Sequence, residues 1–330
     1  MNINGWPSIA WVLGSTHPKD PKRSSTVFAS LIVILVILIV AAAAIAMFAL
    51  TSKDRSVLLG RPLSMQVHGR VRTYRTVGGG GAKNGRRLVV ALHGYGGIGR
   101  QFAYFTALHN ALGSDTVVAY PDALAKTKGG NKPGWNAQFC CGSGWKSGVD
   151  DVAFISSLIK KLSGQLGIEP GRVFIVGFSN GGFMAQRFAV ERPDLVSAVA
   201  VMSGTIGTKG NVLHPTTPVP MLLAHGVHDQ RVRYDGGKSP GDPEFDWLSF
   251  AATVHTWKEA NGCPQEPGSV VKTSGRITTV YSTCKAPLET IEYLNNKHVW
   301  DGWRLANVWT RRPRASVEVA RFFDEIERTR

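Results

Sequence analysis

The sequence predicts an α/β domain with a mainly parallel sheet and helices on both of its faces. Short apolar runs that suit buried strands alternate with segments of helical periodicity, and this order is typical of a parallel sheet. The chain has 330 residues, of which 43% are hydrophobic and 18% charged, so it can build a full core. No internal repeat and no second-domain break is visible, which favours one large domain.

The first half of the pattern begins with a Gly-rich turn at 76–86, followed by an apolar run that ends in His-Gly-Tyr-Gly-Gly. A later segment, 123–148, shows no clear periodicity, and long loops in compact domains are often functional. Asp150 or Asp151 is placed to cap the helix that comes next. We expect strands at 87–92 and 116–120 and helices at 101–112 and 149–166.

The second half begins with an apolar strand that runs from Val173 straight into Gly177. The final helix carries apolar residues at the spacing of one helix face, namely Val317, Val319, Phe322, Phe323 and Ile326. We expect further strands at 197–202, 221–224, 277–282 and 288–293, and helices at 181–191, 247–260 and 315–328.

The net charge of the chain is +15 and its pI is about 9.9. Such a balance predicts attraction to anionic surfaces such as membrane lipid, acidic wall polymers or nucleic acid. The basic residues are scattered, however, without a run of five or six and without interleaved aromatic residues. We therefore expect no nucleic-acid partner and a generally basic, solvated surface.

One segment, 27–50, is almost wholly apolar over 24 residues. A helix needs about 20 residues to span a bilayer, whereas the apolar part of a secretory signal has about 7–15. A polar tail at 1–26 precedes the segment and carries Lys19, Lys22 and Arg23. We expect a membrane anchor; cleavage near Ala46 or Ala49, which would release the domain at 53–330, is the alternative.

The cysteines indicate on which side of the membrane the domain lies, because the positive charges flanking the apolar segment balance. There are four cysteines and no Cys-x-x-Cys spacing, so a zinc site is not expected. An even number favours disulfides in an exported domain. Cys263 with Cys284 is the first choice among three pairings, since each flanks a short strand-rich stretch; the adjacent Cys140 and Cys141 form a ring or stay free. We expect the domain outside the cytoplasm.

Residues 177–181 read Gly-Phe-Ser-Asn-Gly, a Gly-x-Ser-x-Gly pattern between a predicted strand and a predicted helix. In such a turn the serine oxygen is lifted above the sheet, and side chains at the glycine positions would clash with neighbouring backbone. Ser179 is the candidate nucleophile. The backbone N–H of Asn180, at the positive end of the next helix, is a candidate oxyanion donor.

A serine hydroxyl needs a base, and after this motif the chain order is an acid followed by a histidine. Asp229 lies just past the strand at 221–224, where it can orient an imidazole; Asp235, Asp242 and Asp246 are rivals in a looser segment. Of the later histidines, His255 falls within a predicted helix, whereas His298 follows a late strand. We prefer Asp229 and His298 as acid and base. The backbone N–H of Tyr95, in the loop after the first apolar strand, is the second candidate oxyanion donor, and His93 beside it is interpreted as structural.

A family resemblance rests on a series of motifs in order: LHGYGG, YPD, a Trp-containing loop ending in CCG, VDDVAFI, GRVFIVGFSNGGFMA, HGVHDQRVRY, WKEANGC and a late HVW. Over about residues 60–325 the chain resembles the extracellular esterases grouped with polyhydroxybutyrate depolymerases, feruloyl esterases and acetyl xylan esterases. The resemblance implies a secreted α/β-hydrolase without metal or cofactor. It supports Ser179, Asp229 and His298 as a triad and a Cys263–Cys284 disulfide.

The chain departs from the family around the base, where Asn-Lys-His-Val-Trp-Asp-Gly stands in place of Gly-Gly-His-x-Trp-Pro-Gly. Its substrate therefore stays open: acylated glycans or small esters come first, then polyester oligomers and lipid-like esters. Trp135, Trp145 and Trp300 are candidates to line an aromatic cleft. Two other functions use the same fold, an inactive binding protein and an acyltransferase with the same triad.

Overall fold

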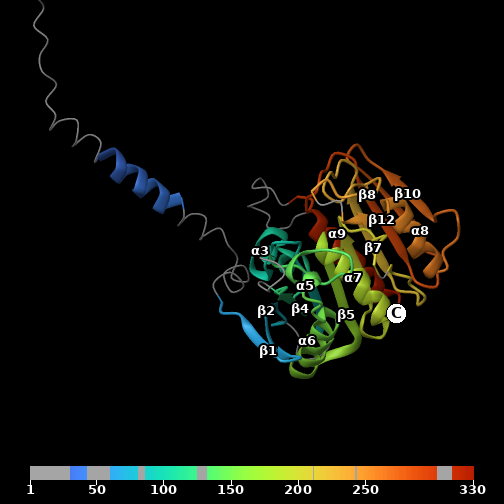
Figure 1. Cartoon of the computed structure of the whole chain (residues 1–330), viewed down its shortest axis with the longest axis horizontal. Helices are drawn as coiled ribbons and strands as arrows, with labels where there is room; N and C mark the ends of the chain where they lie inside the picture. The colour runs from blue at the N-terminus through green and yellow to red at the C-terminus, as the bar shows by residue number, and fades with distance from the viewer. Residues whose placement is uncertain are drawn as a thin grey trace, which may run out of the picture. The chain divides into compact units, whose positions relative to one another are not determined.

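The computed structural model describes residues 30–42, 60–80, 86–124, 132–210, 212–241, 244–302 and 314–330 (Figure 1). The chain divides into two units, Met1–Ala49 and Leu50–Arg330. In the first unit the described residues, 30–42, form a helix with exposed aliphatic side chains. No helix in the described ranges has both the length and the apolar character of a membrane span. Residues 27–29 and 43–50 of the expected anchor lie outside the described residues, as does the tail at 1–26, so the anchor stays a prediction.

The second unit is built on one sheet of ten strands in its described part. The six central strands run parallel, and antiparallel strands extend the sheet at both edges. Their order across the sheet is β1 (Leu63–Val67), β2 (Arg70–Gly78), β4 (Thr116–Pro121), β3 (Arg86–Leu92), β5 (Ile168–Phe178), β6 (Ala198–Met202), β7 (Met221–Gly226), β12 (Leu288–Tyr293), β11 (Arg276–Tyr281) and β10 (Ser269–Lys272). The expected mainly parallel sheet is confirmed.

Two apolar cores lie on the two faces of this sheet, because successive side chains of a strand point to opposite faces. In β3, for example, Leu88 and Val90 pack into one core and Val89 and Ala91 into the other. The helices on the first face are α6 (Asp151–Leu166), α7 (Asn180–Glu191) and α8 (Phe250–Ala260). Those on the second face are α3 (Gly99–Thr106), α4 (Leu108–Ala111) and α9 (Arg314–Arg328). Both faces are therefore covered, as the sequence predicts (Figure 1).

The differences from the expected elements lie at the sheet edges and in one helix. β1, β2 and β10 were not expected. The side chains of β1 and β10 are largely exposed and show no apolar run, and β2 mixes its apolar residues with Arg and Thr and extends into the expected Gly-rich turn. The helix expected at 101–112 is split at Ala107, whose φ of 42° lies in the left-handed region and ends α3. The long loop at 123–148 contains a short helix, α5 (Gly142–Lys146), while its residues 125–131 lie outside the described part.

The disulfide expected between Cys263 and Cys284 is confirmed, with an S–S distance of 2.06 Å. It ties the segment after α8 to the connection between β11 and β12. Cys140 and Cys141 are also joined to each other as a vicinal pair, linked by a cis peptide bond. Both pairings are thus settled in the structure, including the one that the sequence left open.

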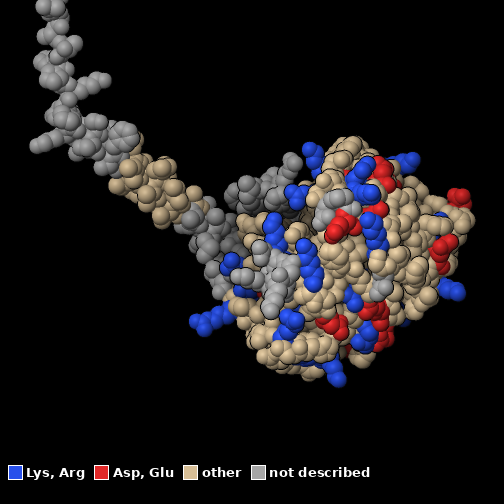
Figure 2. All heavy atoms as spheres, viewed as in Figure 1, with Lys and Arg blue, Asp and Glu red and all other residues tan. Residues whose placement is uncertain are grey.

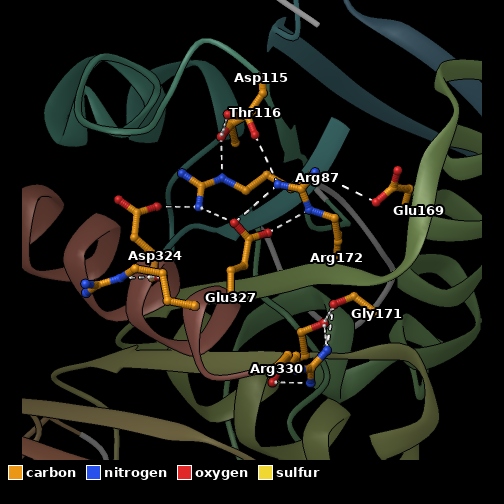
Figure 3. Close-up of polar contacts among 11 residues, drawn as sticks. Arg87, Asp115, Thr116, Glu169, Gly171, Arg172, Asp324, Glu327 and Arg330 are labelled. Carbon is orange, nitrogen blue, oxygen red and sulfur yellow. Dashed lines mark hydrogen bonds and ion pairs between the residues drawn. The ribbon is translucent and has the colours of Figure 1, made fainter. Parts of the chain in front are cut away.

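A cluster of ion pairs fastens α9 to the ends of the strands far from the glycine-rich turn after β5 (Figure 3). Arg87 of β3 is 3% exposed and contacts both Asp324 and Glu327 of α9. Arg172 of β5 binds Glu327 at 2.9 Å and Asp115 at 3.1 Å. Because Arg87 is buried, its charge needs these partners. The C-terminal helix is therefore held by charge as well as by its apolar face.

The surface charge is distributed rather than gathered. On the face shown in Figure 2, Lys and Arg are spread over the Leu50–Arg330 unit and lie among Asp and Glu. Many arginines are in ion pairs, such as Arg192 with Asp194 at 2.7 Å and Arg187 with Glu191 at 2.6 Å. This arrangement fits the scattered basic residues seen in the sequence.

Candidate active site

The turn between β5 and α7 carries Ser179 in a strained conformation, with φ 55° and ψ −122°. Glycines on either side make the turn possible. A Cβ at Gly177 would lie 2.0 Å from the carbonyl oxygen of Gly181, and a Cβ at Gly181 would lie 2.1 Å from that of Leu92. Only residues without a side chain fit at both places. The turn therefore presents the Ser179 hydroxyl beyond the carboxyl end of the sheet.

His298 lies between Ser179 and Asp229. Its Nε2 is 2.9 Å from the Ser179 Oγ, and its Nδ1 is 2.6 Å from an Asp229 carboxylate oxygen. The three side chains follow the ends of β5, β7 and β12; β7 and β12 are neighbours in the sheet, and β6 separates β7 from β5. The Phe178 ring packs on the imidazole, with centroids 5.0 Å apart. Residues up to 119 apart in the sequence thus form one hydrogen-bonded chain.

Asp229 is buried, and its carboxylate accepts several hydrogen bonds. The N–H groups of Arg231 and Val232 donate to one oxygen at 2.8 and 3.0 Å. The other oxygen faces His298 and, at 3.4 Å, the Nε2 of His225. Burial alone would raise the pKa of Asp229, but the hydrogen bonds from His225 and His298 outweigh it and hold the pKa below its usual range. The carboxylate is therefore ionised at neutral pH and orients the Nδ1–H of His298.

His225 is a site residue that the sequence analysis missed. It is fully buried in β7, and its Nε2–H donates to the Val232 carbonyl oxygen at 2.8 Å. This bond and its approach to Asp229 make His225 a second imidazole beside the oxygen that His298 contacts. The i, i+4 spacing from Asp229 was the available signal, but in a strand followed by a turn that spacing does not predict a contact.

The candidate oxyanion donors lie on either side of Ser179. Asn180 begins α7, so its backbone N–H belongs to the unpaired first turn of the helix. The loop with Tyr95 also approaches the serine, since a Cβ at Gly94 would lie 3.4 Å from the Ser179 Cβ. Within the described part of the chain, the backbone N–H of Tyr95 donates to no protein acceptor. Both N–H groups are thus available near the hydroxyl.

The side chain of Asn180 has a second task, which is to hold the loop beside the nucleophile. Its Oδ1 accepts from the N–H of Trp135 at 2.7 Å, and its Nδ2 donates to the carbonyl oxygens of Trp135 and Cys140 at 3.1 and 3.3 Å. Asp151 supports the same loop by accepting from the N–H of Asn136 at 2.7 Å. The segment 135–141 is therefore fixed against α7.

A pocket of about 520 Å³ opens over Ser179 and His298. Its walls combine aromatic side chains with smaller and polar residues, and half of the lining residues come from the segment between β7 and α8. The aromatic residues that line it are Tyr95, Phe178, Phe183, Phe245 and Trp247. Cys140 and Cys141 form another part of the wall. An ester with a bulky apolar portion fits such walls.

The structure corrects the expected substrate-binding tryptophans. Trp135 is fully buried, and its Nε1–H donates to the His93 carbonyl oxygen at 2.9 Å. Trp300 is 4% exposed and donates to the Ser316 hydroxyl at 3.0 Å. Neither lines the pocket. Trp145 is half-buried and reaches it only indirectly, through an edge contact with Phe245 at 5.4 Å. Phe245 and Trp247 take the place that was assigned to these residues.

His93 is structural, as its position before the oxyanion loop suggests. Its Nδ1–H donates to the Gly94 carbonyl oxygen at 2.8 Å, and its Nε2 accepts from the N–H of Ala123 at 3.0 Å. Burial lowers the pKa of His93 to about 4, against the opposing effect of the Gly94 hydrogen bond. The imidazole is therefore neutral at working pH and ties the ends of β3 and β4 together.

The lowered pKa of His93 predicts a pH dependence of stability. The unfolded chain takes up this proton near pH 6.5 and the folded chain only near pH 4, so the free energy of unfolding falls as the pH drops between them. The full loss is about 3 kcal/mol, of which about 2 kcal/mol falls between pH 6.5 and pH 4.5. His93→Gln should remove the part of this pH dependence that His93 causes. Urea unfolding at pH 6.5 and 4.5 measures the free energy of unfolding. His255→Gln, which alters a histidine 59% exposed, should keep the wild-type dependence; an equal dependence in the His93 variant would contradict the assignment.

Comparison with known proteins indicates ester hydrolysis. Residues 80–240 match the Phospholipase/Carboxylesterase family, a region that includes Ser179 and Asp229. The chain is 29% identical to "Putative esterase NocK" of Nocardia uniformis subsp. tsuyamanensis, over 72% of each chain. It is 26% identical to feruloyl esterase C of Emericella nidulans, over 69% of this chain and 76% of the relative. These relatives identify the chain as a carboxylic ester hydrolase.

The fold of this esterase is also found among solved structures. An acetyl xylan esterase from Aspergillus awamori superposes with a TM-score of 0.51 at 16% sequence identity, covering 72% of this chain and 94% of the other. At that identity the likeness concerns the fold alone. The α/β-hydrolase fold and the expected resemblance to the esterases are thus confirmed.

Proposed function

We propose that the chain hydrolyses carboxylic esters through an acyl-enzyme on Ser179. His298 Nε2 takes the proton of the Ser179 hydroxyl as its oxygen attacks the ester carbonyl carbon. The N–H groups of Tyr95 and Asn180 stabilise the negative charge that develops on the carbonyl oxygen. His298 then gives the proton to the departing alcohol. Water, deprotonated by His298, attacks the acyl-enzyme and restores Ser179.

The observation that carries this proposal is the continuous hydrogen-bonded chain from Ser179 through His298 to Asp229, at 2.9 and 2.6 Å. Asp229 is ionised, so it stabilises the imidazolium that forms when His298 takes the serine proton. The strained turn keeps the nucleophile exposed to the pocket. Together these features support acyl transfer to water at this site.

For the substrate we propose acylated glycans, feruloyl or acetyl esters, or hydroxyalkanoate oligomers. The aromatic walls of the pocket suit a phenolic acyl group or a sugar ring, and the related feruloyl esterases carry their name for esters of a phenolic acid. The test is a panel of feruloylated and acetylated glycans, 4-nitrophenyl acetate and a hydroxybutyrate trimer, incubated with the full chain. Release of acid from at least one member, absent with Ser179→Ala, is expected; a panel without any Ser179-dependent release would contradict the proposal.

We also propose that the domain acts outside the cytoplasm, held by the apolar segment at 27–50 or released from it. The Cys263–Cys284 disulfide supports this, because such bonds persist in oxidising compartments. Protease added to intact cells should then digest the domain. Protection until the cells are lysed would contradict this placement.

A further inference from the structure

One arginine lines the catalytic pocket without a countercharge. Arg231 is exposed and forms part of the pocket wall together with Ser179 and His298. No ion pair of Arg231 is found within the described ranges of the chain, and none of the described lining residues is Asp or Glu. The guanidinium therefore brings an unneutralised positive charge to the space where the ester binds.

The neighbouring carboxylate forms no ion pair with this guanidinium in the described part of the chain, and its oxygens are taken by other donors. Asp229 receives the backbone N–H groups of Arg231 and Val232 on one oxygen and faces His298 and His225 with the other. The Arg231 backbone N–H donates to Asp229 at 2.8 Å, and this bond fixes the position of the Arg231 backbone. The backbone thus serves the triad while the side chain is left for a ligand.

The surroundings offer apolar contacts beside this charge. Phe245 and Trp247 form an apolar wall in the same pocket, against which the body of an ester can pack. A second cation contacts one lining residue: the Lys132 ammonium is 5.9 Å from the centre of the Tyr95 ring, and that ring lines the pocket. Among the described residues that line the pocket, Arg231 carries a fixed positive charge and none is Asp or Glu.

We propose that Arg231 selects esters that carry a carboxylate, in the alcohol portion or in the acyl portion. A guanidinium binds a carboxylate through two parallel hydrogen bonds, which fixes the orientation of the ester as well as adding affinity. This inference rests on the proposed esterase function and names the substrate class of that site. It sets acidic esters, such as those of hydroxy acids, uronic acids or dicarboxylic acids, above neutral esters of the same size.

Matched pairs of esters test the proposal in the full chain. One pair, 3-acetoxybenzoate and 3-acetoxybenzamide, places the charge in the alcohol portion. The other, the 4-nitrophenyl monoesters of succinic acid and succinamic acid, places it in the acyl portion. The readout is the ratio of kcat/KM for the anionic ester to kcat/KM for its neutral partner, in which a general loss of activity cancels. Arg231→Gln should lower this ratio about threefold to tenfold in at least one pair, and 1 M salt should reduce the wild-type preference.

Three further variants complete the design. Arg231→Glu should lower the ratio further than Arg231→Gln, and Arg231→Lys should keep part of it. Arg233→Gln is the matched control, since it removes the same charge from the same loop at an exposed residue that does not line the pocket. If Arg231→Gln and Arg231→Glu both turn over the esters with a ratio within twofold of the wild-type ratio, this inference is wrong and the proposed function still stands. Absence of turnover of all four esters would overturn the proposed function and this inference with it.

Discussion

Replacing Ser179 by alanine is expected to lower kcat on every ester substrate by about 10⁶-fold, the size of effect known for removing a triad serine. The physical reason is that the variant lacks the attacking atom, the Oγ that lies 2.9 Å from the His298 Nε2. Activity that remains would come from the oxyanion donors and substrate binding alone. Steady-state assays with 4-nitrophenyl acetate, together with circular dichroism to verify folding, measure the effect.

The control for this variant is Ser157→Ala, a serine on α6 outside the catalytic pocket. It should keep the wild-type rate, because neither its side chain nor its helix contacts the triad. If the Ser179 variant kept more than a hundredth of the wild-type kcat while remaining folded, Ser179 would not be the nucleophile.

Replacing Asp229 by asparagine is expected to lower kcat by about 10⁴-fold with little change in structure. The amide cannot balance an imidazolium, and its NH₂ group disfavours the tautomer in which His298 Nδ1–H donates to the residue at 229. The site geometry predicts that His298 then carries its proton on Nε2, facing Ser179, where it can no longer accept. Kinetics and the ¹⁵N chemical shifts of His298 together measure this result.

Asp235→Asn is the matched control, because Asp235 was a rival for the acid and lies exposed in the same segment. It should leave kcat unchanged. There is also a consequence for stability: the pKa of Asp229 is lowered on folding, so its charge stabilises the fold above the unfolded pKa and ceases to do so as pH falls through the folded pKa. Asp229→Asn should therefore weaken the acid dependence of unfolding. A variant with wild-type kcat would remove Asp229 from the mechanism.

The nucleophilic turn and its partners were predictable because chain order and local geometry are coupled at this site. Gly177 and Gly181 mark a turn that only glycines permit, and the loops after later strands reach the same edge of a parallel sheet. That logic separated His298 from His255, which lies 59% exposed on α8 beside Glu259. The triad contacts follow from the topology once the strands are assigned.

The pocket walls were not predictable in the same way. Trp135 was expected to meet substrate, but Asn180 and His93 hold it in the core by hydrogen bonds that no local pattern encodes. Phe245 lies in a segment without periodicity and Trp247 was expected to begin a helix, whereas both precede α8 (Phe250–Ala260) and reach the pocket through packing near Phe183 of α7. Side-chain exposure in irregular loops depends on tertiary contacts, whereas strand and helix positions depend largely on local pattern.

The edge strands show the same limit for the fold. β10 is exposed along its whole length, and β1 has only two half-buried residues, so neither carries the apolar run that marked the central strands. Their pairing is set by neighbours that the chain reaches through short connections, β11 and β2. Backbone hydrogen bonding to an existing sheet, rather than burial of side chains, places these strands.

The central claim is that Ser179 is an activated nucleophile, and covalent labelling tests it most directly. The full chain, kept under oxidising conditions, would be treated with a fluorophosphonate, digested and analysed by mass spectrometry. We expect one adduct per chain on Ser179, absent in Ser179→Ala and formed far more slowly in His298→Ala. A folded chain that forms no adduct, or forms it at another residue, would contradict the account.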